Sequence, residues 1–184
     1  WLGRCPSCGS WNTLVEEPVG SGAPAEALLE APRAGGLPVR LGDVRSEETP
    51  RFPSGIGELD RVLGGGIVPG AVLLLGGEPG VGKSTLALQL AAEARAAGRT
   101  VLYVCGEESP EQVRLRAERL PGDPADVLVI AETRVEALGA AWRETKPDLV
   151  IVDSIQTVRT DRVESAPGSV AQVRECAALL AAAA

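Results

Sequence analysis

The residues best suited to chemistry lie in a glycine-rich segment, Gly77–Ser84, which matches the pattern G-x-x-x-x-G-K-[ST] throughout. Its glycines would let backbone amides curl around an anion, and a helix after it would direct its positive end to the same point. We expect Lys83 to reach the β- and γ-phosphates of ATP, the hydroxyl of Ser84 to hold Mg²⁺, and Thr85 to contact the α-phosphate. The alternative is a chance glycine-rich turn. The predicted nucleotide contacts are Gly77, Glu78, Pro79, Gly80, Val81, Gly82, Lys83, Ser84 and Thr85.

A second candidate is the carboxylate of Asp153, which ends the apolar run 149–152. In proteins with this kind of phosphate loop, such an aspartate fixes Mg²⁺ through its water shell. Taken alone, the run could equally be a buried strand whose last residue begins a turn. The occurrence of the run in the same chain as a phosphate loop favours a role for Asp153 in binding Mg²⁺. Gln156 follows three residues later and could sense the γ-phosphate through its amide or anchor a loop.

Hydrolysis also requires a group that orients and deprotonates the attacking water. Glu107 and Glu108 come just after an expected strand at 100–104. The carboxyl ends of parallel strands share one edge of a sheet, so these carboxylates should face the γ-phosphate. We therefore favour Glu107 as the catalytic base, with Glu108 as its helper and Lys83 beside the transferred phosphate. The two acids could instead cap a helix that begins at Pro110.

Alternating patterns predict the elements that must position these groups. Short apolar runs alternate with segments of helical periodicity from residue 51 onward, which is typical of an α/β domain with a predominantly parallel sheet. The expected strands are 71–75, 100–104, 127–130 and 148–152, and the expected helices are 57–63, 83–97, 110–120, 135–144 and 170–184.

The N-terminal part has a different character. Cys5 and Cys8 form a CxxC turn with the spacing of a zinc knuckle, but two thiolates cannot complete a tetrahedral site. Residues 18–50 are rich in proline and glycine, which indicates a linker. We therefore expect half a zinc finger at 1–17, a linker at 18–50 and a catalytic core at 51–184.

Composition narrows the possible functions. The net charge is −7 and histidine is absent, which argues against binding nucleic acid through bulk positive charge. No apolar run reaches 18 residues, so no transmembrane helix is expected. The four cysteines suit a reducing cytoplasm better than a disulfide scaffold. The first residue is Trp1 and the last residues continue a helical pattern, so we expect a piece of a longer protein.

Several segments together resemble the RadA/Sms family of bacterial DNA-repair ATPases in the RecA superfamily. The run Arg51–Gly66 leads into the phosphate loop as in that superfamily, and Val150–Ser154 is similar to its magnesium strand. Trp1–Gly9 resembles the second half of the family's four-cysteine zinc finger. Glu107–Ser109 and Asp153–Thr157 are similar to two further family segments. The family's first CxxC, its KNRFG motif and its Lon-protease-like domain are absent from the chain.

The resemblance implies a RecA-like ATPase that forms a homo-hexameric ring. Such a ring would move on single-stranded DNA, promote branch migration during recombination and act beside a RecA-type recombinase. It also implies Zn²⁺ on Cys5 and Cys8 once a second cysteine pair is supplied. A KaiC-like scaffold, in which ATP drives assembly rather than movement on DNA, is the alternative, because KaiC-like proteins carry a similar acidic pair.

DNA contact is harder to place from the sequence. The scarcity of aromatic residues argues against a platform on which bases stack. The segment after Asp153 offers two arginines, Arg159 and Arg162, together with Thr157 and Thr160. RecA-type rings turn this region toward a central pore, so we predict that Arg159 and Arg162 contact DNA. A solvated loop is the simpler interpretation.

Overall fold

The computed structural model describes residues 39–43, 50–122 and 124–184. The chain divides into two units, Trp1–Ser46 and Glu47–Ala184. The described part of the first unit contains a short 3₁₀ helix, η1 (Leu41–Asp43). The predicted zinc ligands Cys5 and Cys8, and most of the predicted linker, lie outside the described residues.

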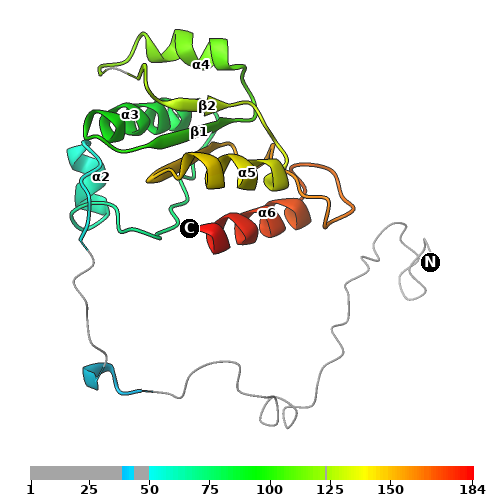
Figure 1. Ribbon diagram of the computed structural model, residues 1–184, viewed down its shortest axis with the longest axis horizontal. Coiled ribbons are helices and arrows are strands. Elements are labelled where there is room, and N and C mark those ends of the chain that lie inside the picture. The colour runs from blue at the N-terminus through cyan, green and yellow to red at the C-terminus, as the bar shows by residue number, and fades with distance from the viewer. Residues whose placement is uncertain (1–38, 44–49, 123) are drawn as a thin grey trace, which may run out of the picture. The chain divides into compact units, whose positions relative to one another are not determined.

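Helices and strands alternate through the second unit, as predicted (Figure 1). All five expected helices form, and three of the four expected strands form, with boundaries that lie within three residues of the predictions. No helix in the described part of the chain is both long and apolar enough to span a bilayer. The elements are α2 (Gly57–Val62), α3 (Lys83–Ala96), β1 (Val101–Cys105), α4 (Pro110–Ala117), β2 (Leu128–Ile130), α5 (Val135–Thr145), β3 (Leu149–Asp153) and α6 (Val170–Ala183).

The three strands form a parallel sheet in the order β2-β1-β3, which confirms the predicted α/β class. The central strand, β1, consists of five apolar or aromatic residues, and all five are buried. Strands covered on both faces read as continuous apolar runs, because neither face can carry polar side chains into solvent. The register pairs Tyr103 with Ile151 and Cys105 with Asp153, so β1 and β3 end at the same level.

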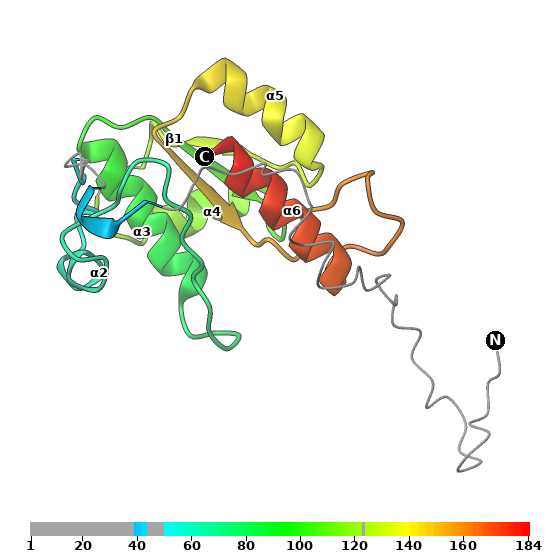
Figure 2. The same cartoon turned by 90° about the horizontal axis from the view of Figure 1, so that it is seen from below.

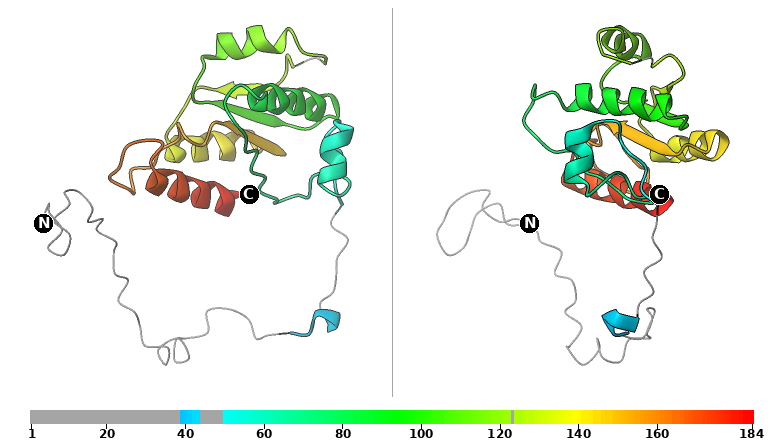
Figure 3. Two further views of the ribbon diagram at one scale, coloured as in Figure 1. Left: turned by 180° about the vertical axis from the view of Figure 1, so that it is seen from behind. Right: turned by 90° about the vertical axis from the view of Figure 1, so that its left-hand side faces the viewer.

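Helices cover both faces of this sheet (Figure 3). Side chains alternate along β1, and the alternation divides the core into two clusters. On one face, Val101, Tyr103 and Cys105 pack with residues of α3 and α4; these are Leu88, Ala91, Ala94, Val113 and Ala117. On the other face, Leu102 and Val104 pack with Leu138 of α5, with Cys176 of α6 and with Val158. The two cysteines of the core, Cys105 and Cys176, are free and buried, as expected.

The expected strand at 71–75 is wrong. Residues 71–78 form no strand, and Val72, Leu73, Leu74 and Leu75 are 61, 49, 88 and 47% exposed. A strand exists through ladder hydrogen bonds to a neighbour, and within the described residues β3 pairs only with β1. The apolar run at 71–75 is therefore left without ladder partners among the described residues.

The segment that leads toward the phosphate loop is closed by a short antiparallel bridge between two of its own residues. Phe52 and Ile67 exchange both backbone hydrogen bonds, at 2.9 and 2.8 Å. The guanidinium of Arg99 lies 4.8 Å from the centroid of the Phe52 ring, which adds a cation–π contact. Gly66 has a φ of 127°, and a Cβ there would lie 2.5 Å from the Phe52 carbonyl oxygen, so only glycine fits.

Candidate nucleotide-binding site

The glycine-rich loop projects from the N-terminal end of α3 (Figure 2). Gly82 occupies the N-cap position with a left-handed φ of 101°, a conformation that glycine adopts without strain. No side chain caps the helix at this end, so its first amides have no side-chain acceptor. Free amides at a helix N-terminus, together with the helix dipole, form an anion-binding point. The start of α3 therefore has the features of an anion-binding point, and the predicted phosphate contacts remain predictions.

Lys83 lies across this loop. Its Nζ donates to the carbonyl oxygens of Gly77 and Glu78, both at 2.8 Å. These contacts hold the ammonium group over the loop whose amides would surround an anion. Thr85, in the first turn of α3, is exposed. The positions of Lys83 and Thr85 agree with the predicted roles, which remain predictions.

Ser84 and Asp153 meet although they are 69 residues apart in the sequence. The Ser84 hydroxyl donates to Oδ1 of Asp153 at 3.0 Å. One residue lies in the first turn of α3 and the other ends β3. Mg²⁺ prefers hard oxygen ligands, and this pair places a hydroxyl and a carboxylate oxygen next to each other beside the phosphate loop. The two residues therefore fit the predicted magnesium site.

The second oxygen of Asp153 has a partner that sequence reasoning missed. The phenol of Tyr103 donates to Oδ2 at 2.7 Å, and Tyr103 is only 1% exposed. Burial is the main cause that raises the pKa of this phenol well above its ordinary value, and the hydrogen bond to Asp153 adds to it. Tyr103 therefore stays protonated and donates to the carboxylate.

Glu107 lies on the same edge of the sheet, as predicted. The Ser154 hydroxyl donates to its Oε1 at 2.6 Å, which ties Glu107 to the first residue after β3. The amide of Gly106 donates to the carbonyl oxygen of Asp153 at 2.9 Å, so the ends of β1 and β3 are joined. Glu107 itself is exposed, which leaves its carboxylate accessible to solvent.

Glu108 is placed differently from Glu107. It forms an ion pair with Arg116 of α4, and the two side chains are 31 and 30% exposed. Neither acid caps α4, because Ser109 accepts from the Gln112 amide while the Gln112 side chain accepts from the Ser109 amide. The capping alternative for the two acids is thus contradicted, and Glu108 is occupied by a cation.

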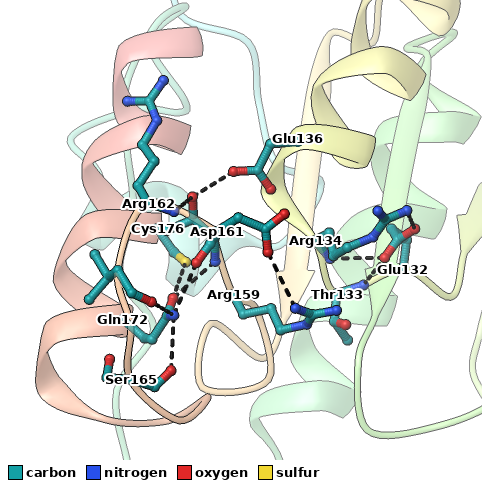
Figure 4. Close-up of polar contacts among 12 residues, drawn as sticks. Glu132, Thr133, Arg134, Glu136, Arg159, Asp161, Arg162, Ser165, Gln172 and Cys176 are labelled. Atoms are coloured by element: carbon teal, nitrogen blue, oxygen red, sulfur yellow. Dashed lines mark hydrogen bonds and ion pairs between the residues drawn. The ribbon is translucent and has the colours of Figure 1, made fainter.

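The segment after β3 is anchored by hydrogen bonds to two helices (Figure 4). Gln172 of α6 is 2% exposed; its Oε1 accepts from the Thr160 amide, and its Nε2 donates to the carbonyls of Thr160, Val163 and Ser165. The Thr160 hydroxyl donates to Glu136 of α5 at 2.6 Å. Thr160 is itself buried, so its side chain is not presented at the surface of this segment.

The two arginines proposed for DNA contact remain at the surface. Arg159 pairs with Arg134 in a parallel bridge, and its side chain lies 3.5 Å from Asp161. Arg162 lies 3.9 Å from Glu175, and its side chain is 65% exposed. Long, exposed ion pairs of this kind contribute little to stability, so the guanidinium groups can exchange their partners. Gln156 lies in the exposed turn after Asp153.

Sequence reasoning missed Tyr103, Ser154, Arg116 and Gln172. Tyr103 carried one usable signal, since it is the sole tyrosine of the chain and stands in an otherwise apolar strand. A buried phenol requires a hydrogen-bond partner. The other three contact residues 7 to 47 positions away, and no local pattern predicts such contacts.

Two family models match the chain. Residues 52–129 match an ATPase model described as KaiC, which covers the phosphate loop and the two acids. Residues 1–16 match a model described as rubredoxin metal binding domain, which includes Cys5 and Cys8. The first match supports a RecA-like ATPase core, and the second supports a zinc-ribbon segment at the N-terminus.

Curated relatives extend the similarity over nearly the whole chain. It is 46% identical over 183 residues to DNA repair protein RadA of Bacillus subtilis, covering 98% of this chain and 40% of the relative. It is 49% identical over 186 residues to RadA of Brucella abortus, covering 96 and 39%, and 48% identical over 185 residues to RadA of Pseudomonas aeruginosa, covering 98 and 40%. The chain thus spans about two fifths of the length of these relatives. With its phosphate-loop motif, its parallel sheet and this identity along nearly its whole length, the chain belongs to the RadA family of RecA-like ATPases.

Proposed function

We propose that this chain forms the ATP-hydrolysing core of a DNA-repair motor that acts on single-stranded DNA and promotes branch migration as a ring. The contact between Ser84 and Asp153 carries the proposal, because it brings a magnesium-binding pair beside a phosphate loop. The identity to DNA repair proteins named RadA supports the biological role.

The chain's own residues suggest how hydrolysis proceeds. Phosphate oxygens would replace the carbonyls of Gly77 and Glu78 as acceptors for Lys83, while the loop amides hold the β- and γ-phosphates. Mg²⁺, when bound by Ser84 and Asp153, would neutralise negative charge on the phosphates. Glu107 would release the Ser154 hydroxyl and take a proton from water on Oε1. The resulting hydroxide attacks the γ-phosphorus, and ADP leaves. Gln156 would report the γ-phosphate to the following loop.

DNA would contact the surface that carries Arg159 and Arg162. Both side chains keep exposed guanidinium groups, and the overall charge of −7 confines any attraction to local sites of this kind. In a homo-hexamer, six copies of this surface would act together on one strand. We further propose zinc on Cys5 and Cys8, a cytoplasmic location and a RecA-type recombinase as a partner.

A KaiC-like assembly scaffold is the second candidate, because residues 52–129 match the model with that description. Such a scaffold would use the same ATP site but would not respond to DNA. The two functions differ in one measurable property, which is the effect of single-stranded DNA on the rate of ATP hydrolysis.

The test is therefore an ATPase assay with and without single-stranded DNA at low salt. The motor requires stimulation by DNA, and it requires that the double variant Arg159→Ala and Arg162→Ala lose most of this stimulation. Arg119→Ala with Arg143→Ala is the matched control, since it removes two exposed arginines that form no ion pair with any of the described residues. Equal rates with and without DNA would favour the scaffold, and retained stimulation in the first variant would refute the DNA assignment.

A further inference from the structure

The phenol of Tyr103 is a polar group inside an apolar strand. The other members of β1 are three aliphatic residues and one cysteine, and all five are buried. Burying a hydroxyl is unfavourable unless it forms a hydrogen bond, and phenylalanine would fill the same space without that requirement. The hydroxyl of Tyr103 therefore needs an explanation beyond packing, and its partner supplies one, because it is the carboxylate of Asp153.

Strand geometry accounts for the contact. The parallel register places Asp153 opposite Cys105, two residues beyond Tyr103, and side chains two residues apart share one face of a strand. A tyrosine that leans along its strand can thus reach the end of the neighbouring strand. The contact occurs on the face covered by α3, and Ser84 approaches the same carboxylate from the start of that helix.

The two carboxylate oxygens of Asp153 have different hydrogen-bond donors. Oδ2 accepts from Tyr103 at 2.7 Å, and Oδ1 accepts from Ser84 at 3.0 Å. The terminal torsion of an aspartate is broad and roughly two-fold, so an unsupported carboxylate samples many orientations. A fixed donor on Oδ2 removes that freedom and leaves Oδ1 on the side of Ser84 and the phosphate loop.

The neighbouring charges do not compete for the phenol. Glu108 and Arg116 are near enough to Tyr103 to act on it electrostatically, but their side chains form an ion pair with each other. Among the described residues, the hydrogen bond of the Tyr103 side chain goes to Asp153. The Tyr103 hydroxyl therefore acts on the carboxylate of Asp153, the proposed magnesium ligand.

We infer that Tyr103 is a positioning residue for magnesium: its hydroxyl orients Asp153 so that one carboxylate oxygen faces the cation beside Ser84. The inference rests on the proposed ATP and magnesium site and adds a residue to it. Partners that orient metal ligands in this way commonly change metal affinity by roughly 10–100-fold when removed.

The test uses Tyr103→Phe, which keeps the buried ring and deletes the hydroxyl. Binding of a fluorescent ATP analogue is measured while Mg²⁺ is titrated, and again in EDTA. We expect the Mg²⁺ concentration for half-maximal binding to rise by roughly 10–100-fold, with affinity in EDTA unchanged. The control Thr145→Val deletes a hydroxyl that bonds the Ala141 carbonyl in α5, and it should match the wild type.

A second variant traces the effect to the carboxylate. In an Asp153→Asn background, adding Tyr103→Phe should not change the Mg²⁺ requirement further, because the oriented group is already altered. An unchanged Mg²⁺ requirement in Tyr103→Phe, or an equal loss of affinity with and without Mg²⁺, would overturn the inference. A wild-type protein that binds the nucleotide equally well in Mg²⁺ and in EDTA, or does not bind it, would instead overturn the proposed site.

Discussion

Gly106 is the position where one added methyl group should disturb the site most. It links β1 to Glu107 and packs against the turn after β3. A Cβ at Gly106 would lie 1.8 Å from Oγ1 and 2.7 Å from Cβ of Thr157. Rotating the Thr157 side chain would move Oγ1 away but would leave its Cβ in place. The substitution Gly106→Ala therefore forces the backbone of the two segments apart.

The cost follows from this geometry. Overpacking of a closely fitted interior typically destabilises a protein by about 1–3 kcal/mol. For a chain of this size, each kcal/mol lowers the melting temperature by about 2–4 °C. The displacement also threatens the hydrogen bond from the Ser154 hydroxyl to Glu107, because both residues adjoin the separated backbone. Gly106→Ala should thus lose stability and ATPase activity together.

Urea denaturation and ATPase assays can measure both losses, and variants at Thr157 sharpen the test. Removing Oγ1 alone, in Thr157→Ala, leaves the 2.7 Å contact and should rescue Gly106→Ala only in part. Removing the Cβ as well, in Thr157→Gly, should relieve the clash completely, although the single variant Thr157→Gly will itself be less stable. If Gly106→Ala is as stable and active as the wild type, or if both Thr157 changes rescue equally, the steric reasoning is refuted.

Three further predictions concern stability. Ser109→Ala removes the N-cap of α4 and should cost about 1 kcal/mol in urea denaturation, whereas Ser109→Asp, which can still cap, should cost less. Gln172→Ala leaves the buried Thr160 amide without its acceptor and should cost about 1–3 kcal/mol, measured in the same way; an unchanged midpoint would contradict the anchoring role. The hydrogen bond from Thr160 is the main cause that lowers the pKa of Glu136. A depressed carboxyl pKa stabilises the fold at neutral pH, and the stabilisation is lost as the pH falls below about 4.3 and through the folded-state pKa. Glu136→Gln should therefore show a smaller loss of stability on acidification than the wild type, and identical profiles would contradict this.

Local patterns were sufficient for most of the fold. Periodicity predicted the helices, and continuous apolar runs predicted β1, β2 and β3, because these signals lie in the order of residues within each segment. The segment 71–75 has the same apolar character as β3, yet it forms no strand. Whether such a run is paired depends on a partner elsewhere in the chain, and the run itself contains no information about that partner.

The candidate site shows the same division. The glycines and Lys83 could be singled out because their spacing matches a phosphate-binding loop, and Asp153 because it ends an apolar run. The preference for Glu107 over Glu108 rested on position alone, since only the folded chain brings Arg116 beside Glu108 and Ser154 beside Glu107. Tyr103 was missed for a similar reason, because its partner is 50 residues away.

The free side of β3 has a practical consequence for the isolated protein. One edge of this strand carries backbone amides and carbonyls that have no ladder partners among the described residues. The run Val72–Leu75 is strongly apolar and is exposed to solvent. An unpaired strand edge of this kind is a template to which another molecule can add a strand. Concentrated solutions should therefore scatter light increasingly with time, and Leu74→Lys should slow this self-association, since Leu74 is the most exposed of the four.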